Sequence, residues 1–366
     1  MKIIHLSSAI TWRGGEQQLA YLYEELNSKN IEQIVLCPEN SELYKKFKKK
    51  GFEKLIGYKK ISSLNIAFAL KLKKICRENK VDLIHVHDAH AHTFAFLSAL
   101  LFFNKTPVIV SRRVDFPIGR SIFSKIKYNH KSIHKIICVS NAIKNIMHKD
   151  IKKADKLITI HSGIDTKRFP YQNHTNKLRE LLNLDEDTII IGNTSAIAPH
   201  KDYFTFVDTA EIIIEKIPNV HFVILGDGNM HNEISNYIKS KNLQKHFSLL
   251  GFRENIHELL PDFDVFLLTS KTEGLGTSIL DAFACSIPVV ATEAGGITEI
   301  VIHNETGLLA QIKNPQQLAD NVIKLITDNS LKTMLTRNAK KKLNDFTKQQ
   351  TATKILEVYY QILRPL

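Results

Sequence analysis

The stretch of residues 270–296 holds the densest set of side chains that could do chemistry. Its turn EGLG, which begins at Glu273, lies between a short apolar run and a helical pattern. Glycines let a ligand approach the backbone closely, and free N–H groups at a helix N-terminus bind anions. We expect Thr277 to be the N-cap of this helix, with Asp281 four residues later on the same face.

Two carboxylates therefore flank a site of about the size of a phosphate group, Glu273 before the turn and Asp281 after it. Carboxylates accept hydrogen bonds from pairs of neighbouring hydroxyls, which sugars carry. The pattern favours a site for a phosphorylated ligand that is rich in hydroxyls. A capped helix with two solvated acids explains the same spacing and stays open as an alternative.

Three weaker signals lie elsewhere in the chain. Gly15 belongs to the turn WRGGE, which lacks the G-x-G-x-x-G spacing of dinucleotide-binding proteins. Gly226 opens the turn GDGN after a strand, where a nucleotide base could lie against the backbone, although a plain tight turn fits equally well. Lys201 in APHKD follows another strand and could reach a diphosphate as a point charge, or could simply be solvated.

Four histidines cluster in IHVHDAHAH: His85, His87, His90 and His92. Alternate residues of a strand share a face, so a metal site is conceivable. However, two of these histidines would lie beside buried sheet, and no cysteine is close in the sequence. We therefore expect no metal site, and instead a strand-end histidine or Asp88 that faces a ligand-binding cleft.

Short runs rich in Ile and Val alternate with longer helical patterns in both halves of the chain. In the first half, strands are predicted at 2–7, 31–38, 53–58, 82–87, 107–111, 135–140 and 157–164. In the second half, they are predicted at 188–195, 221–226, 248–252, 265–270, 288–292 and 307–310. This rhythm is typical of two doubly wound α/β domains, each a parallel sheet covered by helices on both faces.

We predict domains at 1–165 and 184–343, joined by a linker at 166–183 that is polar and contains Pro170. Residues 344–366 are predicted to form a terminal helix, which could belong to the second domain or return to the first. Open α/β sheets bind ligands at the carboxyl ends of their strands. The expected active site is therefore a cleft between two domains that face each other.

Charge is divided unevenly between the halves. Residues 1–165 contain 29 basic and 14 acidic side chains, whereas residues 166–366 contain 21 and 23. The excess favours a polyanionic partner for the first half, nucleic acid or an anionic membrane, but a solvated lysine-rich surface is equally compatible. The four cysteines form no close pair, and the longest apolar run, at 94–103, is about half a membrane span, so we expect neither export nor a transmembrane anchor.

The stretch EGLGTSILDAFACSIPVVATEAGG resembles the donor-site signature of the family 4 retaining glycosyltransferases, which have the GT-B fold. Supporting similarities run through nearly the whole chain: WRGGEQQL, DLIHVHDA, IICVSNAI, IHSGIDTKRF, APHKD, VILGDGN, LLGFRENI and NETGLLA. The resemblance implies two Rossmann-like domains and transfer of a sugar from a nucleotide-sugar donor.

The resemblance also implies roles for residues of the second domain. Glu273 would bind hydroxyls of the donor sugar, and Asp281 the ribose, although the family normally carries Glu at that position. Lys201 would neutralise the leaving diphosphate without the arginine that is common in the family five residues earlier, where this chain has Ala196. The remaining donor-binding residues implied are Gly15, Gly226, Phe252, Arg253, Leu275, Gly276 and Thr277.

On the first domain, many relatives carry a histidine after the fifth strand, where this chain has SRRVDFP. We expect Arg113, or its neighbour Arg112, to supply positive charge at that place. Asp115 would orient the acceptor hydroxyl.

The sequence therefore predicts a retaining hexosyltransferase that needs no metal or other cofactor. The expected donor is a UDP-sugar, with GDP or ADP as other bases, and the expected acceptor is a glycan or a lipid-linked sugar in polysaccharide or lipopolysaccharide synthesis. The lysines of KKFKKK at 45–50, with Lys59, Lys60, Lys71, Lys73 and Lys74, would dock on anionic lipid at the inner face of the cytoplasmic membrane. A sugar-nucleotide epimerase and a non-catalytic polyanion-binding module are the alternatives, and no nucleic-acid partner is expected.

Overall fold

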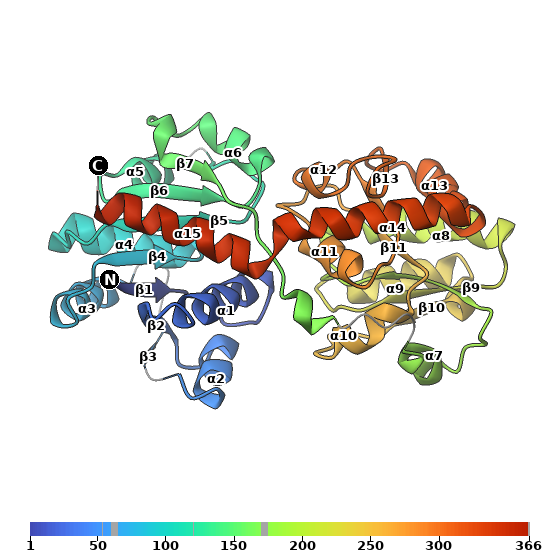
Figure 1. The fold of residues 1–366 in the computed structure, drawn as a ribbon, viewed down its shortest axis with the longest axis horizontal. Coiled ribbons are helices and arrows are strands. Elements are labelled where there is room, and N and C mark those ends of the chain that lie inside the picture. The colour runs from blue at the N-terminus through green and yellow to red at the C-terminus, as the bar shows by residue number, and fades with distance from the viewer. Residues whose placement is uncertain (53, 60–64, 120, 170–174, 365–366) are drawn as a thin grey trace. The chain divides into compact units, whose positions relative to one another are not determined.

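A computed structural model describes residues 1–52, 54–59, 65–119, 121–169 and 175–364. The chain forms two compact units (Figure 1): unit 1 comprises Met1–Gly163 and Lys348–Leu366, and unit 2 comprises Ile164–Thr347. The chain thus passes from one unit to the other twice. Each unit is a doubly wound α/β domain, which confirms the predicted fold class.

Unit 1 is built on a parallel sheet in the order β3-β2-β1-β4-β5-β6-β7. Its strands are β1 (Lys2–Leu6), β2 (Glu32–Pro38), β3 (Leu55–Tyr58), β4 (Leu83–Val86), β5 (Val108–Arg112), β6 (Ile133–Cys138) and β7 (Leu157–Thr159). The helices are α1 (Gly14–Asn27), α2 (Glu42–Lys49), α3 (Ile66–Glu78), α4 (Ala89–Phe102), α5 (Ile122–Asn129), α6 (Asn141–His148) and α15 (Lys348–Leu363). From β1 the chain adds β2 and β3 on one side and then returns to add β4 on the other, so β1 and β4 are neighbours at the switch point of the sheet.

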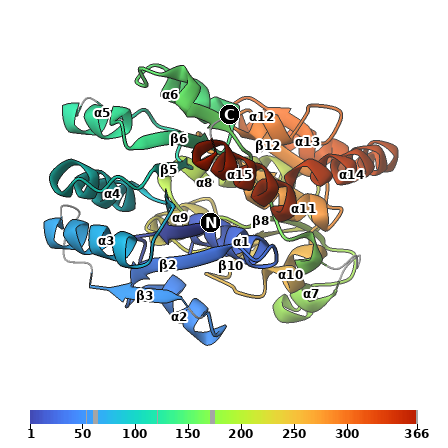
Figure 2. The same ribbon diagram turned by 60° about the vertical axis from the view of Figure 1, so that its left-hand side comes forward.

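The C-terminal helix α15 belongs to unit 1. Its apolar face, with Ile355 and Val358, packs with Ile3 of β1 and Leu22 of α1 in one buried cluster. Figure 2 shows α15 beside α1. The helix begins at Lys348. The sequence left open whether it returns to the first domain, and in the structure it does.

Unit 2 repeats the same topology, with the sheet order β10-β9-β8-β11-β12-β13 and parallel pairing throughout. Its strands are β8 (Ile189–Asn193), β9 (Val220–Ile224), β10 (Phe247–Leu249), β11 (Val265–Leu268), β12 (Val289–Thr292) and β13 (Leu308–Ala310). Its helices are α7 (Lys177–Leu182), α8 (Tyr203–Lys216), α9 (His231–Ser240), α10 (Ile256–Leu259), α11 (Thr277–Ala284), α12 (Ile297–Ile300), α13 (Pro315–Thr327) and α14 (Asn329–Leu343). Short 3-10 turns complete both units: η1 (Ala154–Lys156), η2 (Thr166–Arg168), η3 (Pro199–Lys201), η4 (Gln244–His246), η5 (Leu260–Asp262) and η6 (Asn344–Phe346).

The described part of the predicted linker at 166–183 is structured and belongs to unit 2. Its anchor is Asp262, a fully buried carboxylate after α10. Asp262 accepts hydrogen bonds from the Thr175 hydroxyl at 3.1 Å and from the backbone N–H groups of Asn176 at 2.8 Å and Leu178 at 2.7 Å. A polar sequence here reflects capping of α7 rather than a free connection, and Pro170 lies outside the described residues.

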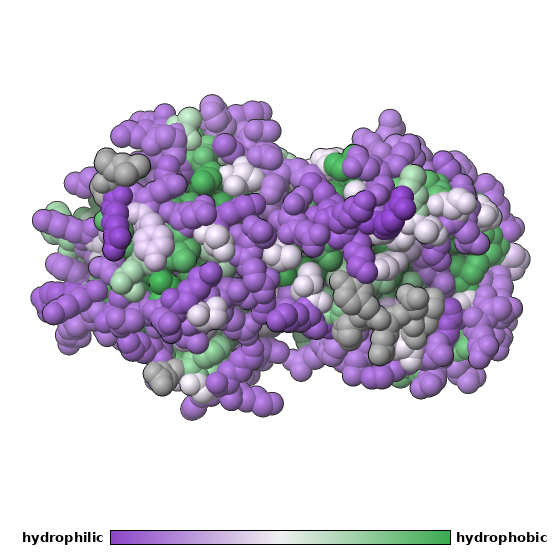
Figure 3. Space-filling model, in the orientation of Figure 1, coloured by the Kyte–Doolittle hydropathy of each residue, from purple (hydrophilic) through white to green (hydrophobic). Residues whose placement is uncertain are grey.

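Hydrophilic side chains cover most of the visible face of each unit, with smaller apolar areas between them (Figure 3). Among the described residues, none of the helices combines the length and the apolar composition needed to cross a bilayer.

We predict that Asp262→Ala destabilises unit 2, because it leaves the backbone N–H groups of Asn176 and Leu178 without their acceptor, whereas the Thr175 hydroxyl keeps its bond to the Glu258 carbonyl. The expected loss is about 3 kcal/mol of unfolding free energy, since each such bond to a charged group contributes about 1.5–3 kcal/mol before relaxation. Calorimetry of the full chain measures it. The matched control is Asp320→Ala, which removes an exposed ion pair with Lys216 and should cost less than about 0.5 kcal/mol. Equal effects of the two substitutions would contradict the capping role.

Candidate active site

Lys201 and Glu273 form a short-range ion pair in unit 2. Lys201 ends η3 after β8, and Glu273 follows β11, the neighbouring strand. The Lys201 Nζ lies 2.9 Å from Oε1 and 2.7 Å from Oε2 of Glu273. The side chains are only 11% and 13% exposed. The loops after adjacent parallel strands meet at one edge of the sheet, which explains how residues so far apart in sequence come together.

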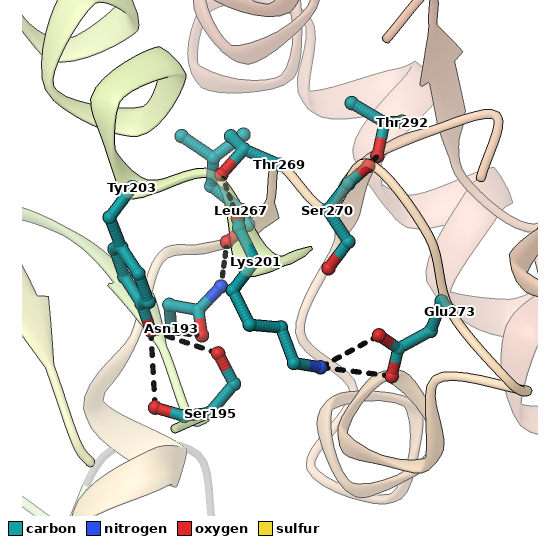
Figure 4. Close-up of polar contacts among 9 residues, drawn as sticks. All are labelled: Asn193, Ser195, Lys201, Tyr203, Leu267, Thr269, Ser270, Glu273 and Thr292. Atoms are coloured by element: carbon teal, nitrogen blue, oxygen red, sulfur yellow. Dashed lines mark hydrogen bonds and ion pairs between the residues drawn. The ribbon is translucent and has the colours of Figure 1, made fainter. Parts of the chain in front are cut away.

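The backbone that carries Lys201 is held by residues that follow β11, among them Thr269 (Figure 4). The Thr269 hydroxyl, at the end of β11, contacts the carbonyl oxygens of Lys201 and Asp202, each at 3.1 Å. The Lys271 N–H donates to the His200 carbonyl at 2.8 Å, and the Lys271 ammonium pairs with the Asp202 carboxylate at 3.0 Å. The position of the Lys201 ammonium is therefore set by the strand next to its own.

Glycines shape the turn between β11 and α11. Gly276 is the N-cap of α11 with a φ of 87°, which disfavours any side chain there. Thr277, which we expected at the N-cap, is instead the first helical residue, so its hydroxyl does not cap the helix. A Cβ on Gly295 would lie 2.3 Å from the Glu273 carbonyl oxygen, which accepts the Gly296 N–H at 2.9 Å. The later glycines thus hold the backbone of Glu273 in place.

This geometry can bind an anion. The first turn of a helix leaves backbone N–H groups without helical acceptors, and in α11 these belong to the turn at Gly276 and Thr277. The side chain of Leu275 is buried, so only its backbone is available to a ligand. The Ser270 hydroxyl is buried, has no hydrogen-bond partner among the described residues, and points toward the Lys201–Glu273 pair in Figure 4. Sequence reasoning assigned no role to Ser270.

Asp281 lies one turn into α11 and is partly buried. Among the described residues, no hydrogen bond or ion pair holds its carboxylate. Burial raises the pKa of Asp281 from 3.8 to about 7, and the positive charge of Arg168 opposes this rise only in part. An unsatisfied carboxyl of this kind is available to accept hydrogen bonds from a ligand's hydroxyls, as predicted for ribose, once it is ionised.

Gly226 has a packing reason as well as its predicted binding role. A Cβ there would lie 2.0 Å from the Ser195 carbonyl oxygen, so the loops after β8 and β9 can touch only if this residue is glycine. Gly226 also pairs with Gly251, next to Phe252. Phe252 is 60% exposed and offers a ring face, while the Arg253 Nε donates to the Leu250 carbonyl at 3.1 Å. These residues lie near one another at the edge of the unit 2 sheet, and their role as a cradle for the base stays a prediction.

In unit 1, Arg113 follows β5 and binds His87, the residue directly after β4. Its guanidinium donates to the His87 carbonyl at 2.9 Å and lies 3.2 Å from His87 Nδ1. A Cβ on Gly15 would lie 3.9 Å from Arg113 Cδ, so the glycine turn and the arginine are neighbours, and their roles toward the donor stay predictions. Burial lowers the pKa of Arg113 to about 10, against the opposing effect of Glu16 and Asp88, and the side chain stays cationic near neutral pH.

The neighbouring candidates are engaged differently. Arg112 is buried, donates to the Tyr128 hydroxyl at 3.1 Å and also contacts the Phe116 carbonyl, so it is a structural side chain in this conformation. Asp88 caps α4 by accepting hydrogen bonds from the N–H groups of His90 and Ala91 at 3.1 and 2.9 Å, and the expectation that it faces a ligand stays a prediction. Asp115 is partly buried, and none of the described residues forms a hydrogen bond or ion pair with its carboxylate.

Three buried histidines lie together in unit 1: His5, His85 and His87. They are the one group in the described chain that could hold a metal ion, with one nitrogen of each within 4.8 Å of the others. Every ring nitrogen in the group already has a hydrogen-bond partner, which is the pattern of a polar network and not of a waiting ligand set. Burial lowers the pKa of His5 to about 4 and those of the other two well below their usual value, so all three are neutral near pH 7.

Sequence reasoning missed the residues that hold the candidate groups in place. Thr269 and Ser270 follow an apolar strand directly, and polar residues at that position could have been a signal. His5 lies alone in an apolar strand and gives no such signal, since only the sheet order brings it next to His87.

Comparison with known proteins places the chain in a class and then in a family. Two doubly wound units, the second with a glycine turn at the carboxyl edge of its sheet, are the architecture of the GT-B proteins. Residues 12–168 match the family described as Glycosyltransferase Family 4, and residues 174–342 match the family described as Glycosyl transferases group 1. The chain belongs to the family 4 glycosyltransferases and is an enzyme of that type, as the resemblance implied.

Curated relatives span most of the chain. It is 24% identical over 306 residues to the N-acetyl-alpha-D-glucosaminyl L-malate synthase of Bacillus anthracis, covering 82% of this chain and 80% of the relative. It is 26% identical over 308 residues to a UDP-Gal:alpha-D-GlcNAc-diphosphoundecaprenol alpha-1,3-galactosyltransferase of Escherichia coli, covering 80% and 79%. It is 26% identical over 365 residues to the N,N'-diacetylbacillosaminyl-diphospho-undecaprenol alpha-1,3-N-acetylgalactosaminyltransferase of Campylobacter jejuni, covering 94% of each.

Solved structures share the fold. A glycosyltransferase from Rickettsia africae has a TM-score of 0.87 at 22% identity, over 100% of this chain and 99% of that one. Anabaena HepE in complex with UDP-glucose has a TM-score of 0.85 at 21% identity, over 98% and 99%. The predicted GT-B fold is confirmed.

We predict that Asp281→Asn stabilises the protein at pH 8 and has little effect near pH 4. A raised pKa means that the folded state resists ionisation of this carboxyl, so wild-type stability falls as the pH rises from about 4 to 7 and then levels off. Thermal midpoints across this range measure the effect, with the exposed Asp345→Asn as control. A difference between Asp281→Asn and wild type that is the same at every pH would refute the shifted pKa.

Proposed function

We propose that the protein transfers a hexosyl group from a UDP-sugar to a hydroxyl of a glycan or lipid-linked acceptor, with retention of anomeric configuration. The observation that carries the proposal is the Lys201–Glu273 pair beside the N-terminus of α11, because it combines a fixed cation, a carboxylate and backbone N–H groups at one place. UDP is favoured over GDP or ADP because the similar HepE binds UDP-glucose and the E. coli relative is named for UDP-Gal.

Donor binding would replace the internal ion pair by contacts to the ligand. The diphosphate takes up the charge of Lys201 and the N–H groups of the α11 turn, while Glu273 turns its oxygens to hydroxyls of the sugar. Each side chain exchanges one charged or polar partner for another, so neither is left buried and unpaired. Phe252 stacks on the base, and ionised Asp281 accepts from the ribose.

The chemical step then follows from where negative charge develops. The bond between the anomeric carbon and the diphosphate oxygen breaks, and the acceptor oxygen bonds to the same face of the sugar. The proton of the acceptor hydroxyl passes to the departing diphosphate, which leaves both charge and atoms balanced. In unit 2, Lys201 and the α11 N-terminus stabilise the growing negative charge. For unit 1, we assign a further positive charge to Arg113 and the orientation of the acceptor to Asp115. Because fixed cations supply this charge, we expect no metal requirement.

The acceptor proposal comes from the relatives, two of which are named for undecaprenol-diphosphate sugars. Two features of unit 1 suit work at an anionic membrane, at the inner face of the cytoplasmic membrane in polysaccharide or lipopolysaccharide synthesis. Lys48, Lys49 and Lys50 at the end of α2 are exposed, and α5 exposes the apolar side chains Ile122 and Ile126. The α2 lysines, beside β3, would attract anionic lipid, and the isoleucines of α5, between β5 and β6 toward the other end of the sheet, would enter the lipid surface separately. Lys60, part of the predicted patch, lies outside the described residues.

We predict that the full chain releases UDP from a UDP-sugar only when an acceptor is present, and that NMR of the product shows the donor's anomeric configuration. Lys201→Ala should lower turnover about a hundredfold, because one preorganised charge is lost in the transition state. The exposed Lys216→Ala is the control, and excess EDTA should leave the rate unchanged. Epimerised nucleotide-sugar formed without acceptor, or an inverted product, would contradict the proposal.

A separate prediction concerns the membrane. The protein should co-sediment with phosphatidylglycerol vesicles at low ionic strength and dissociate as salt is raised, because each lysine near the surface contributes about 1 kcal/mol. Replacing Lys48, Lys49 and Lys50 with Gln should weaken binding, whereas replacing Lys340 and Lys341 of α14 in unit 2 should not. Absence of binding at low salt, or equal losses in both variants, would rule out docking through α2.

A further inference from the structure

A continuous line of buried polar side chains runs behind Arg113 in unit 1. The Arg113 guanidinium lies 3.2 Å from His87 Nδ1, and His87 Nε2 lies 3.1 Å from His5 Nδ1. His5 Nε2 lies 3.0 Å from Gln33 Oε1, and the Gln33 side-chain amide donates to the Tyr23 carbonyl at 3.1 Å. The line begins after β5, crosses β4 and β1, and ends on β2 and α1. His5, His87 and Gln33 are all less than 10% exposed.

The direction of every hydrogen bond in this line is determined at its two ends. A guanidinium can only donate, so His87 Nδ1 must accept and His87 Nε2 must carry the proton. A backbone carbonyl can only accept, so Gln33 presents its NH₂ group to Tyr23 and its oxygen to His5. His5 therefore carries its proton on Nε2 and accepts from His87 on Nδ1. Both ends of the line therefore require the same tautomers, with His5 and His87 each protonated on Nε2. Every hydrogen bond in the line then has one donor and one acceptor.

We propose that His87, His5 and Gln33 are positioning residues that fix the orientation of Arg113 through this relay. The inference rests on the role given to Arg113 under the proposed function. The guanidinium also donates a second hydrogen bond, to the His87 carbonyl at 2.9 Å, so His87 holds it at two points. The guanidinium has five N–H groups and His87 takes two, which leaves the others for an anionic group of the substrates, the buried and unpartnered Nε among them.

The relay matters because the guanidinium lacks a direct carboxylate partner among the described residues. Glu16 and Asp88 act on it only at longer range, and both carboxylates accept hydrogen bonds from helix N-termini. Neutral imidazole acceptors hold the cation without cancelling its charge. An ion pair would hold Arg113 equally well, but would weaken its attraction for phosphate.

The third histidine of the group provides an internal control. His85 lies between the Tyr359 hydroxyl at 2.6 Å and the Ser111 hydroxyl at 2.8 Å, so it is equally buried but outside the relay. The ionisable groups packed around the relay are His85 on β4, Glu16 on α1, Asp88 before α4, Tyr359 on α15 and Arg113 itself.

The first test reads the tautomers directly and does not depend on activity. Long-range ¹⁵N–¹H spectra of the full chain labelled at histidine should show both His5 and His87 protonated on Nε2 at pH 7. Assignment uses His5→Gln and His87→Asn. A proton on Nδ1 of either ring would overturn the relay, whatever reaction the protein catalyses.

The second test reverses the direction of the hydrogen bond between His5 and His87 by changing Gln33, the residue at the end of the line away from Arg113. Gln33→Glu places a carboxylate on His5 Nε2 and favours the His5 imidazolium, whose Nδ1–H then donates to His87. His87 must move its proton to Nδ1, where it opposes the Arg113 N–H groups. We expect kcat for UDP release to fall about ten- to a hundredfold at pH 7, the equivalent of one hydrogen bond to a charged group, and to recover as the pH rises and His5 loses its proton. The KM for the UDP-sugar should change less.

Three companion variants separate the possible outcomes. Gln33→Met removes both bonds of Gln33 without adding charge and should give a smaller loss with no pH dependence, and Ser111→Ala should match wild type. Equal profiles for Gln33→Glu and Gln33→Met would overturn the positioning role. Full turnover in Arg113→Ala would overturn it too, because Arg113 would then have no function to support. An inactive Arg113→Ala with a fully active Gln33→Glu would remove the relay alone and leave the proposed transferase intact.

Discussion

The pairing of Lys201 with Glu273 is the interaction on which the candidate site of unit 2 depends. Two charges held at low exposure are stable only if both are present and well placed, since either one alone would be a buried, uncompensated ion. The pair therefore depends on other parts of unit 2. Strand β8 must pair with β11, and the Thr269 hydroxyl must bind the Lys201 carbonyl. Residue 295 must be glycine, because a Cβ there would clash with the Glu273 carbonyl oxygen. The same requirement keeps both groups ready for a ligand that offers opposite charge and hydroxyls.

Much of this could be predicted from sequence because it is local. A parallel strand buried on both faces must be a short run of apolar residues, and all thirteen runs proposed at the outset correspond to strands in the described chain. Glu273, Gly276 and Asp281 are found for the same reason, since they lie within nine residues of one another. The Lys201–Glu273 pair is different, because it joins loops 72 residues apart and depends on strand order, which no local pattern encodes.

Periodicity also has a clear limit at the ends of the units. The helix that contains Ile355 and Val358 shows an apolar face in the sequence, but an amphipathic pattern does not say which surface it covers, and the structure places it against β1 and α1. The polar stretch before α7 misleads in another way, because its composition predicts solvent exposure. It has the composition of a free linker, yet its N–H groups are satisfied by Asp262, a residue more than eighty positions later. Composition cannot tell a solvated backbone from one satisfied by a distant carboxylate.

The histidines of unit 1 show how the same residue types can mean different things. Spacing alone could not distinguish a metal site, a cleft-facing base and a core network, because each needs alternate residues on one strand face. The structure shows a hydrogen-bonded network, since a neutral imidazole inside a sheet must find a donor and an acceptor at once. Satisfying that requirement for His5 and His87 in series leaves one consistent direction of hydrogen bonds, which ends on Arg113. The orientation of this cation is thus set from within the core of unit 1, whereas that of Lys201 is set by loops of unit 2.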